Sequence, residues 1–224
     1  LTVDNKNKSL KLTSLERDSY VDIPGHGKQK LTHAYAYGGI SLLLQTIEDN
    51  FKVDIQEYAV VDFYSFMDII DAIGGVTVDI NQNEIKELNK FIPETYNWNK
   101  NSNKGPIEYI QSAGEQKLNG YQALSFSRIR KNDSAFERDR RQRLVIEGLM
   151  KGVKDLPVAK YPQIIALGSK ILSIGDFNIK QMEFPIMDGI NGKSEKVNGK
   201  WVVKFDPISL DILHDFIFKN IIPE

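Results

Sequence analysis

The chain contains no cysteine and only three histidines. The absence of cysteine excludes disulfide bonds, thiol catalysis and thiolate metal sites. No second histidine stands at metal-ligand spacing from His33, so this residue is interpreted as a packed or loop residue rather than as a ligand. Tyr35 and Tyr37 could border a ligand, but an ordinary junction between a loop and a helix explains them equally well.

Long apolar runs are also missing. The most apolar region, residues 58–80, is interrupted by four aspartates, Asp62, Asp68, Asp71 and Asp79. A membrane span needs about 20 nearly uninterrupted apolar residues, so no span is predicted there. The net charge is -1 over 224 residues, and no overall field attracts the chain to nucleic acid. The length and the 41% hydrophobic content fit one globular domain of ordinary size, or two small ones.

Arginine is scarce and unevenly placed. Apart from Arg17, every arginine lies in the stretch 127–143, which reads SRIRKNDSAFERDRRQR. Lysines, by contrast, are scattered along the whole chain. A guanidinium group binds carboxylate or phosphate through two parallel hydrogen bonds and stays charged when water is removed. The stretch therefore predicts a site for an oxyanion, with phosphate as the first candidate.

Apolar periodicity predicts alternating strands and helices. Strands are expected at residues 1–4, 10–14, 58–63, 76–80, 180–186 and 200–205, and helices at 40–50, 65–73, 119–128, 135–154, 158–172 and 208–219. Residues 58–80 read as strand, helix, Gly-Gly and strand, which favours a crossover unit in an α/β sheet. Residues 191–198 are expected to form a polar turn between the last two strands, and Asp68 and Asp71 are expected to face solvent.

The arginine stretch is expected to enter a helix near residue 135. Ser134 and Glu137 have the spacing of a capping box. At 100° per residue, Arg138 and Gln142 continue the apolar face of this helix and Arg141 lies at its edge. A charged side chain on a buried face needs a partner, and the helix start adds amides and a positive dipole end for an anion.

Two arginines of this helix have a simpler explanation. Arg140 and Arg143 are expected to point away from the apolar face. In this interpretation the expected ion pairs are Asp139 with Arg143 and Glu137 with Arg141. Arg128 and Arg130, which stand before the helix, could face one side of an extended segment. Together with Arg138 and Gln142 they form a candidate pyrophosphate clamp.

At these residues the chain resembles the LytR-CpsA-Psr family. The segments that carry the resemblance are LTSLERDSYVDIPGHGKQKLTHAYAYGG, YAVVDFYSFMDIIDAIGGVTVDI, GEQKLNGYQALSFSRIR and the arginine stretch itself. They agree with the family in order and spacing from about Leu1 to Gly152. The resemblance implies a single α/β domain over residues 1–224, with a mixed central β-sheet sandwiched between α-helices.

The resemblance also implies an activity. Members of this family transfer an anionic glycopolymer, such as wall teichoic acid or capsular polysaccharide, from undecaprenyl pyrophosphate to peptidoglycan and form a phosphodiester link. Mg²⁺ assists at the pyrophosphate, and the polyprenyl chain lies in a hydrophobic groove. The apolar residues of 158–172 could wall such a groove, although core packing explains them by default. The chain is expected to be an extracytoplasmic fragment, held at the cell membrane by an N-terminal anchor that precedes Leu1.

By position, the resemblance carries the catalytic and phosphate-binding roles over to Arg17, Arg128, Arg130, Arg138 and Gln142. Arg141 is expected to contact the substrate as well. The family's metal-binding aspartates belong to a segment upstream of Leu1, so no metal ligand can be named. Asp133 and Asp18 are the acids expected near the clamp. Glu16 stands where the family usually has proline.

Three alternatives remain open. The chain could hold polyprenyl pyrophosphate without turning it over, or hydrolyse the lipid pyrophosphate to water. Nucleic-acid binding is the third and weakest alternative. Nucleic-acid bases stack on aromatic side chains, and only Phe126 and Phe136 stand among the arginines.

Overall fold

The computed structural model describes residues 1–130, 135–152 and 178–223. The predicted helix 158–172, Ser134 of the predicted capping box and Asp133 lie outside the described residues. Backbone contacts group the chain into two compact units. Unit 1 comprises Leu1–Tyr58 and Phe177–Glu224, and unit 2 comprises Ala59–Asp176. The single domain expected over 1–224 stays a prediction.

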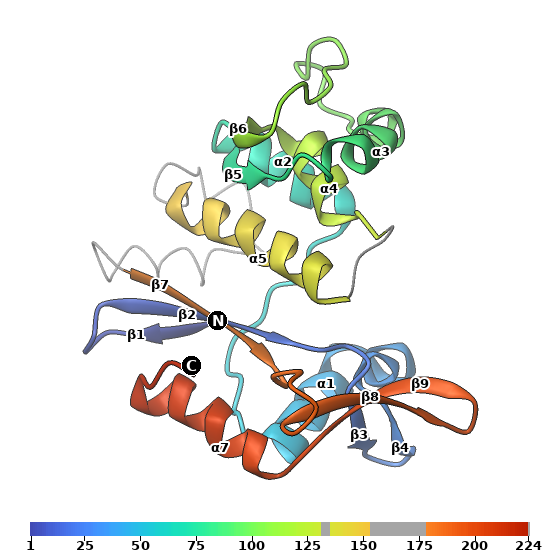
Figure 1. Cartoon of the computed structure of the whole chain (residues 1–224), viewed down its shortest axis with the longest axis vertical. Coiled ribbons are helices and arrows are strands. Elements are labelled where there is room, and N and C mark those ends of the chain that lie inside the picture. Colours follow the sequence, from blue (N-terminus) through green and yellow to red (C-terminus); the bar gives the residue numbers. More distant parts are fainter. Residues whose placement is uncertain (131–134, 153–177, 224) are drawn as a thin grey trace. The chain divides into compact units, whose positions relative to one another are not determined.

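Unit 1 contains a mixed sheet. Strand β1 (Thr2–Asp4) runs antiparallel to β2 (Ser9–Leu15), and β2 runs parallel to β7 (Asn178–Phe184), with Ser9 opposite Asn178 and Leu15 opposite Phe184. Figure 1 shows β7 beside β2, although about 160 residues separate them in the chain. The prediction of an α/β chain with a mixed sheet is confirmed.

The remainder of unit 1 consists of two hairpins and two helical segments. Strands β3 (Tyr20–Ile23) and β4 (Gly27–Lys30), which periodicity did not predict, form one hairpin. Strands β8 (Gly192–Val197) and β9 (Lys200–Phe205) form the other. Helix α1 (Leu31–Phe51) is interrupted at Gly38 and Gly39, where φ of Gly39 is +63°. Helix α7 (Ile208–His214) continues into the π-helical turn η4 (Asp215–Lys219).

The core of unit 1 is aromatic. Phe51 of α1 packs edge-on against Phe184 of β7 and is stacked with Phe205 of β9, with ring centroids 5.5 Å apart in both pairs. Burial of such a side chain contributes about 1.5–3 kcal/mol. Beside this core, the buried Lys11 Nζ donates to the Ile217 carbonyl at 2.8 Å and pairs with Asp4 at 2.9 Å. This lysine joins the sheet to the C-terminal turn.

Unit 2 is mainly helical. Its elements are α2 (Phe63–Ala72), β5 (Val76–Ile80), α3 (Ile85–Trp98), β6 (Gly114–Leu118), α4 (Gly120–Ser127) and α5 (Ala135–Gly152). Every residue of α4 is buried, and Asn119 and Gln122 form a capping box at its start. Helix α5 lies close to β5, because a Cβ on Gly148 would come 2.9 Å from Cβ of Val76. These contacts position the arginine stretch, which links α4 to α5.

Three predictions about local structure are wrong. Residues 58–62 are exposed and form no strand, and no strand in the described part of the chain pairs with them. Strand β5 pairs antiparallel with β6, so residues 58–80 contain no parallel crossover. Residues 192–197, which were expected in a turn, form β8, and Asn198-Gly199 alone makes the turn.

The prediction that Asp71 faces solvent is also wrong. Its carboxylate accepts a hydrogen bond from the Gly120 amide at 2.6 Å and another from Asn99 Nδ2 at 3.0 Å. It therefore satisfies an amide at the start of α4, as acidic side chains near helix N-termini commonly do. Asp68 is exposed, as predicted. Among the described residues, no helix is both long and apolar enough to cross a membrane.

Candidate functional site

The centre of the site in unit 2 is the segment Arg128-Ile129-Arg130, which follows α4. The Ile129 carbonyl, between the two arginines, accepts a hydrogen bond from Arg141 Nη2 at 3.0 Å. The Ser127 carbonyl lies 3.5 Å from Gln142 Nε2. Two side chains of α5 thus hold the backbone on which Arg128 and Arg130 stand.

Arg141 is the most buried member of the cluster. Its side chain has no exposed surface, and Nη1 pairs with Glu84 Oε1 at 2.9 Å. The expectation that Arg141 contacts a substrate stays a prediction, and in this structure its guanidinium faces Glu84 and the Ile129 carbonyl. The spacing predicted that Gln142 continues the apolar face towards Val145 and that Arg141 lies at its edge. This prediction is wrong, because the structure buries Arg141 and exposes Gln142. Glu84 explains the choice, since it supplies the counter-charge that a buried guanidinium requires.

Glu84 itself was not singled out from the sequence. It precedes α3 and is only 4% exposed. Its Oε1 accepts from both Arg140 Nη2 and Arg141 Nη1, each at 2.9 Å, and its Oε2 accepts from the Asn81 amide at 2.8 Å. Nothing in the sequence around this glutamate indicates that two arginines more than fifty positions away form ion pairs with it.

The ion pairs on α5 differ from the expected ones. Glu137 pairs with Arg140 at 2.9 Å rather than with Arg141, and Asp139 pairs with Arg138 at 3.2 Å. Arg140 is therefore neutralised by two carboxylates, those of Glu137 and Glu84. This is consistent with the prediction that Arg140 lies outside the clamp.

Arg128 lies against aromatic rings. Its guanidinium carbon is 4.6 Å from the ring centroid of Trp98, 5.2 Å from Phe91 and 5.8 Å from Phe63. Nη1 pairs with Glu94 Oε2 at 2.9 Å, and a quarter of the side chain remains exposed. A planar cation over indole and phenyl faces is held in orientation by the rings. Its exposed edge can still meet an anion that displaces the half-exposed Glu94.

Arg130 and Arg138 keep unused hydrogen-bonding capacity. Arg130 is exposed, and among the residues that the structure describes it forms no ion pair. Arg138 is 14% exposed, and its buried Nε donates to no acceptor within the described part of the chain. A buried guanidinium donor without an acceptor is costly unless a ligand supplies one.

Arg17 belongs to unit 1, in the turn that follows β2. Its side chain is half-exposed, and Nε lies 3.9 Å from Asp18 Oδ1. The turn is fixed by α1, because the carbonyl of Arg17 accepts from the Thr32 amide at 3.0 Å and that of Ser19 accepts from the Leu31 amide at 2.8 Å. Asp18, one of the two expected acids, pairs with Lys30 at 3.1 Å. The joining of Arg17 with the arginines of unit 2 stays a prediction.

Unit 1 also contains two neighbouring carboxylates. The Glu16 amide donates to the Phe184 carbonyl at 2.9 Å, which brings Glu16 beside Glu183 on β7. An oxygen of Glu16 and an oxygen of Glu183 lie within 4.8 Å of each other. Carboxylate oxygens are the ligands that Mg²⁺ prefers, so the pair fits a magnesium ion chemically. Periodicity could not find it, because the two residues are far apart in the chain.

An α/β chain with a mixed sheet and a cluster of arginines after α4 defines a class of protein, and comparison with known proteins identifies the family. The LytR_cpsA_psr family matches residues 1–182. The chain therefore belongs to this family, as its motifs predicted.

Two curated relatives illustrate the similarity. The first is the polyisoprenyl-teichoic acid–peptidoglycan teichoic acid transferase TagU of Enterococcus faecalis. It is 37% identical over 168 residues, which cover 73% of this chain and 49% of that protein. TagU of Bacillus licheniformis is 31% identical over 224 residues, covering 94% of this chain and 67% of that protein. The chain thus spans about half the length of the Enterococcus relative.

Solved structures agree with the fold. The crystal structure of Bacillus subtilis TagT matches with a TM-score of 0.74 at 24% identity, over 97% of this chain and 82% of that one. YwtF (TagT), a LytR-CPS2A-psr family protein with bound octaprenyl pyrophosphate lipid, matches with a TM-score of 0.73 at 25% identity, over 96% and 80%.

Proposed function

We propose that this chain carries the catalytic part of a phosphotransferase, which moves an anionic glycopolymer from a polyprenyl pyrophosphate to peptidoglycan. The observation that carries the proposal is the unequal neutralisation of the arginines in unit 2. Arg140 and Arg141 are neutralised by Glu84 and Arg138 pairs with Asp139, whereas the exposed Arg130 has no acidic partner among the described residues. Arg138 also has a buried Nε that donates to no acceptor in the described part of the chain. The names of the curated relatives support the same reaction.

The chemistry follows from these free donors. An acceptor hydroxyl oxygen forms a bond to the phosphorus next to the glycan, and the bond from that phosphorus to the bridging oxygen breaks. Polyprenyl monophosphate leaves, and the hydroxyl proton passes to a base. Negative charge gathers on the phosphate oxygens in the transition state, so fixed cations are the main catalytic requirement. Arg128, Arg130, Arg138 and Gln142 supply fixed donors, and Arg17 is proposed to complete them.

Magnesium is part of the proposal. Glu16 and Glu183 of unit 1 would hold the ion, because their carboxylate oxygens are neighbours. The bound ion would supply Lewis acidity and neutralise phosphate charge. Asp18 pairs with Lys30 and lies 3.9 Å from Arg17 Nε, so it is proposed to orient Arg17.

The location of the protein follows from the proposed substrates. A polyprenyl pyrophosphate is a membrane lipid, and peptidoglycan lies outside the cell. We therefore propose that the protein works at the outer face of the cell membrane of a Gram-positive bacterium, attached through an N-terminal anchor.

The test is transfer by purified protein from a synthetic polyprenyl-pyrophosphate glycan to peptidoglycan fragments. Arg130→Ala and Arg138→Ala should each reduce transfer by about a hundredfold or more, as removal of a transition-state donor usually does. Arg143→Ala, on the same helix but outside the clamp, is the matched control and should stay within about threefold. Circular dichroism would verify that each variant is folded.

Two outcomes would change the assignment. Release of glycan phosphate into water at the wild-type rate without an acceptor would make the protein a lipid-pyrophosphate hydrolase. Tight binding of the lipid with no turnover in the presence of Mg²⁺ would make it a carrier-binding module. Full transfer by Arg130→Ala and Arg138→Ala would disprove the clamp.

A further inference from the structure

The hairpin β8–β9 ends in a tight and well-defined tip. Val197 pairs with Lys200, and the two residues between them, Asn198 and Gly199, have φ of +49° and +77°. Two-residue turns with positive φ at both positions match the twist of the flanking strands, and Asn-Gly is the favoured sequence for them. The side chains at the tip are therefore presented by a rigid scaffold. The hairpin lies outside residues 1–182, the part that the family matches.

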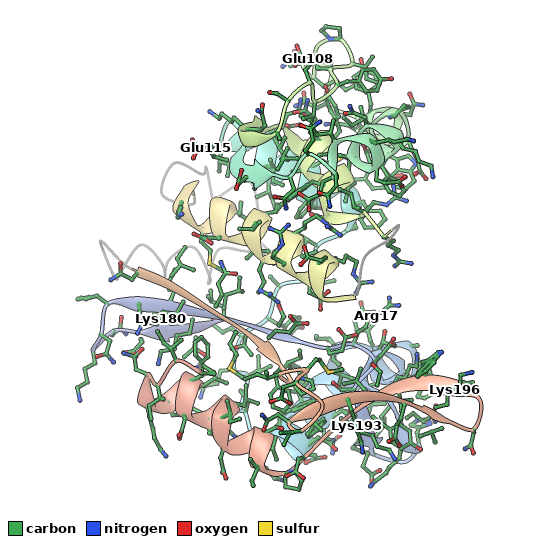
Figure 2. The ribbon with its side chains drawn as sticks, viewed as in Figure 1. Arg17, Glu108, Glu115, Lys180, Lys193 and Lys196 are labelled. Carbon is green, nitrogen blue, oxygen red and sulfur yellow. The ribbon has the colours of Figure 1, made fainter. Side chains whose placement is uncertain are left out.

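Positive charge on this hairpin is neutralised at one end only. Glu195 pairs with Lys193 at 3.8 Å, and it also pairs with Lys204. Lys196 and Lys200, nearer the tip, are exposed and form no ion pair among the described residues. Figure 2 labels Lys193 and Lys196, with Lys196 nearer the free end of the hairpin. The tip therefore keeps two lysines available for an external anion.

An exposed tryptophan stands beside these lysines. Trp201 is 58% exposed, although the next two residues, Val202 and Val203, are buried. Lys196 is its partner in the strand register, and Lys196 Nζ lies 5.2 Å from the ring centroid. An indole face is a large apolar surface with a polar edge, and such exposed faces are enriched where proteins bind ligands. Together, an aromatic face and cations match a ligand that alternates sugar rings with phosphates.

The hairpin is joined to the Arg17 turn within unit 1. The Val203 amide donates to the Asp18 carbonyl at 2.9 Å, and Ser19 and Val203 form a parallel bridge. Arg17 and Trp201 each precede the bridged residue by two positions. Because the strand advances about 3.3 Å per residue, the tip lies on the order of 10 Å beyond the bridge. A polymer whose pyrophosphate end reaches Arg17 could extend along β9 to the tip.

We propose that Lys196, Lys200 and Trp201 form a subsite for the sugar-phosphate repeats of an anionic glycopolymer. The tryptophan stacks on a sugar ring, and the two lysines bind the adjoining phosphates. The proposal rests on the proposed function, because it takes the same polymer as the ligand, but it concerns the chain of the polymer and not its pyrophosphate end. An anionic membrane surface is the rival partner, and the test includes it.

The experiment measures binding of purified wall teichoic acid, freed from its lipid, to the whole chain. The variants are Trp201→Ala and the double variant Lys196→Gln/Lys200→Gln. The control double variant is Lys6→Gln/Lys28→Gln, which removes the same charge from exposed positions elsewhere in unit 1. Each hairpin variant should weaken binding about five- to tenfold, equivalent to roughly 1–1.4 kcal/mol, and the control should change it by less than about twofold.

Further arms separate this proposal from the proposed function. The hairpin variants should bind a short polyprenyl pyrophosphate without polymer as wild type does, whereas Arg138→Ala should lose that lipid and keep the polymer. Equal polymer binding by wild type and both hairpin variants would overturn the subsite, as would an equal loss in the control. Loss of binding to phosphatidylglycerol vesicles with no loss of polymer binding would assign the tip to the membrane instead.

Discussion

Removal of Glu84 is the perturbation that most directly tests the organisation of the arginine cluster. Glu84 accepts three hydrogen bonds, two of them from arginines, and is only 4% exposed. Glu84→Ala would remove the carboxylate that pairs with Nη1 of Arg141, a side chain with no exposed surface. Nη2 would still donate to the Ile129 carbonyl.

The expected cost follows from the burial of the pair. Removal of one partner of a buried ion pair typically costs about 3–5 kcal/mol, because the remaining charge stays desolvated. At about 2–4 °C per kcal/mol for a chain of this size, the unfolding midpoint should fall by about 6–20 °C. Glu84→Gln keeps a hydrogen-bond acceptor but loses the charge, so its midpoint should lie between those of Glu84→Ala and wild type.

The assay is thermal unfolding followed by circular dichroism, with urea unfolding to give the free energy. The matched control is Glu137→Gln, which removes the other carboxylate on Arg140 but is 44% exposed. This control should change stability by no more than about 0.5 kcal/mol. The reasoning is refuted if the unfolding midpoint of Glu84→Ala lies within about 2 °C of that of the control. Glu84 would then not be the counter-charge of a buried arginine.

The Glu84 variants should also report on function. Below its unfolding midpoint, Glu84→Gln should lower the transfer rate, because the backbone between Arg128 and Arg130 is held through Arg141. Arg141→Lys should resemble it, since an ammonium group cannot contact Glu84 and the Ile129 carbonyl in the planar geometry of a guanidinium. Wild-type transfer rates in both variants would show that the contact of Arg141 with this backbone does not affect transfer.

Three further predictions concern stability. Hydrogen bonds from Asn7 and the nearby Lys11 lower the pKa of Asp4 from its usual value of 3.8. The ionised carboxylate therefore stabilises the fold above that pH, and this stabilisation is lost as the pH falls below it. In Asp4→Asn the free energy of unfolding, measured in urea at each pH, should fall less steeply between pH 5 and 2 than in wild type. Gly120→Ala would place a Cβ 2.4 Å from the Met67 carbonyl oxygen and should cost about 1–3 kcal/mol by thermal unfolding, and a loss below about 0.5 kcal/mol would show that α4 shifts freely. Thr95→Val removes a hydroxyl from a buried hydrogen-bond network and should lower the free energy of unfolding, measured in urea, by about 1–3 kcal/mol. An unchanged free energy would contradict the role of that network.

Local chemistry made much of the fold predictable. Strands 76–80 and 200–205 were predicted at their observed bounds, and the helix near 135 was predicted at its observed start. The helix expected at 119–128 is found at Gly120–Ser127, directly after its cap Asn119. These features depend on neighbours a few residues away, which the sequence displays directly.

Pairing between distant segments was less accessible. The run 58–62 has strand composition but is exposed, and no strand among the residues that the structure describes pairs with it. Strands β3 and β4 are short and only partly apolar, and their pairing depends on a turn at Gly25. Composition describes what a segment can form, whereas the presence of a partner decides what it does form.

The sequence by itself determined the class of site. Guanidinium groups concentrated in one stretch, with motifs in the order of one family, implied phosphate chemistry, because these features need only residue identity and spacing. Which arginine is buried, and which remains available, was decided by tertiary structure. Glu84, which precedes α3, pairs with Arg141, and Glu94 of α3 pairs with Arg128. A charge is neutralised by what lies near it in space, whatever its distance along the chain.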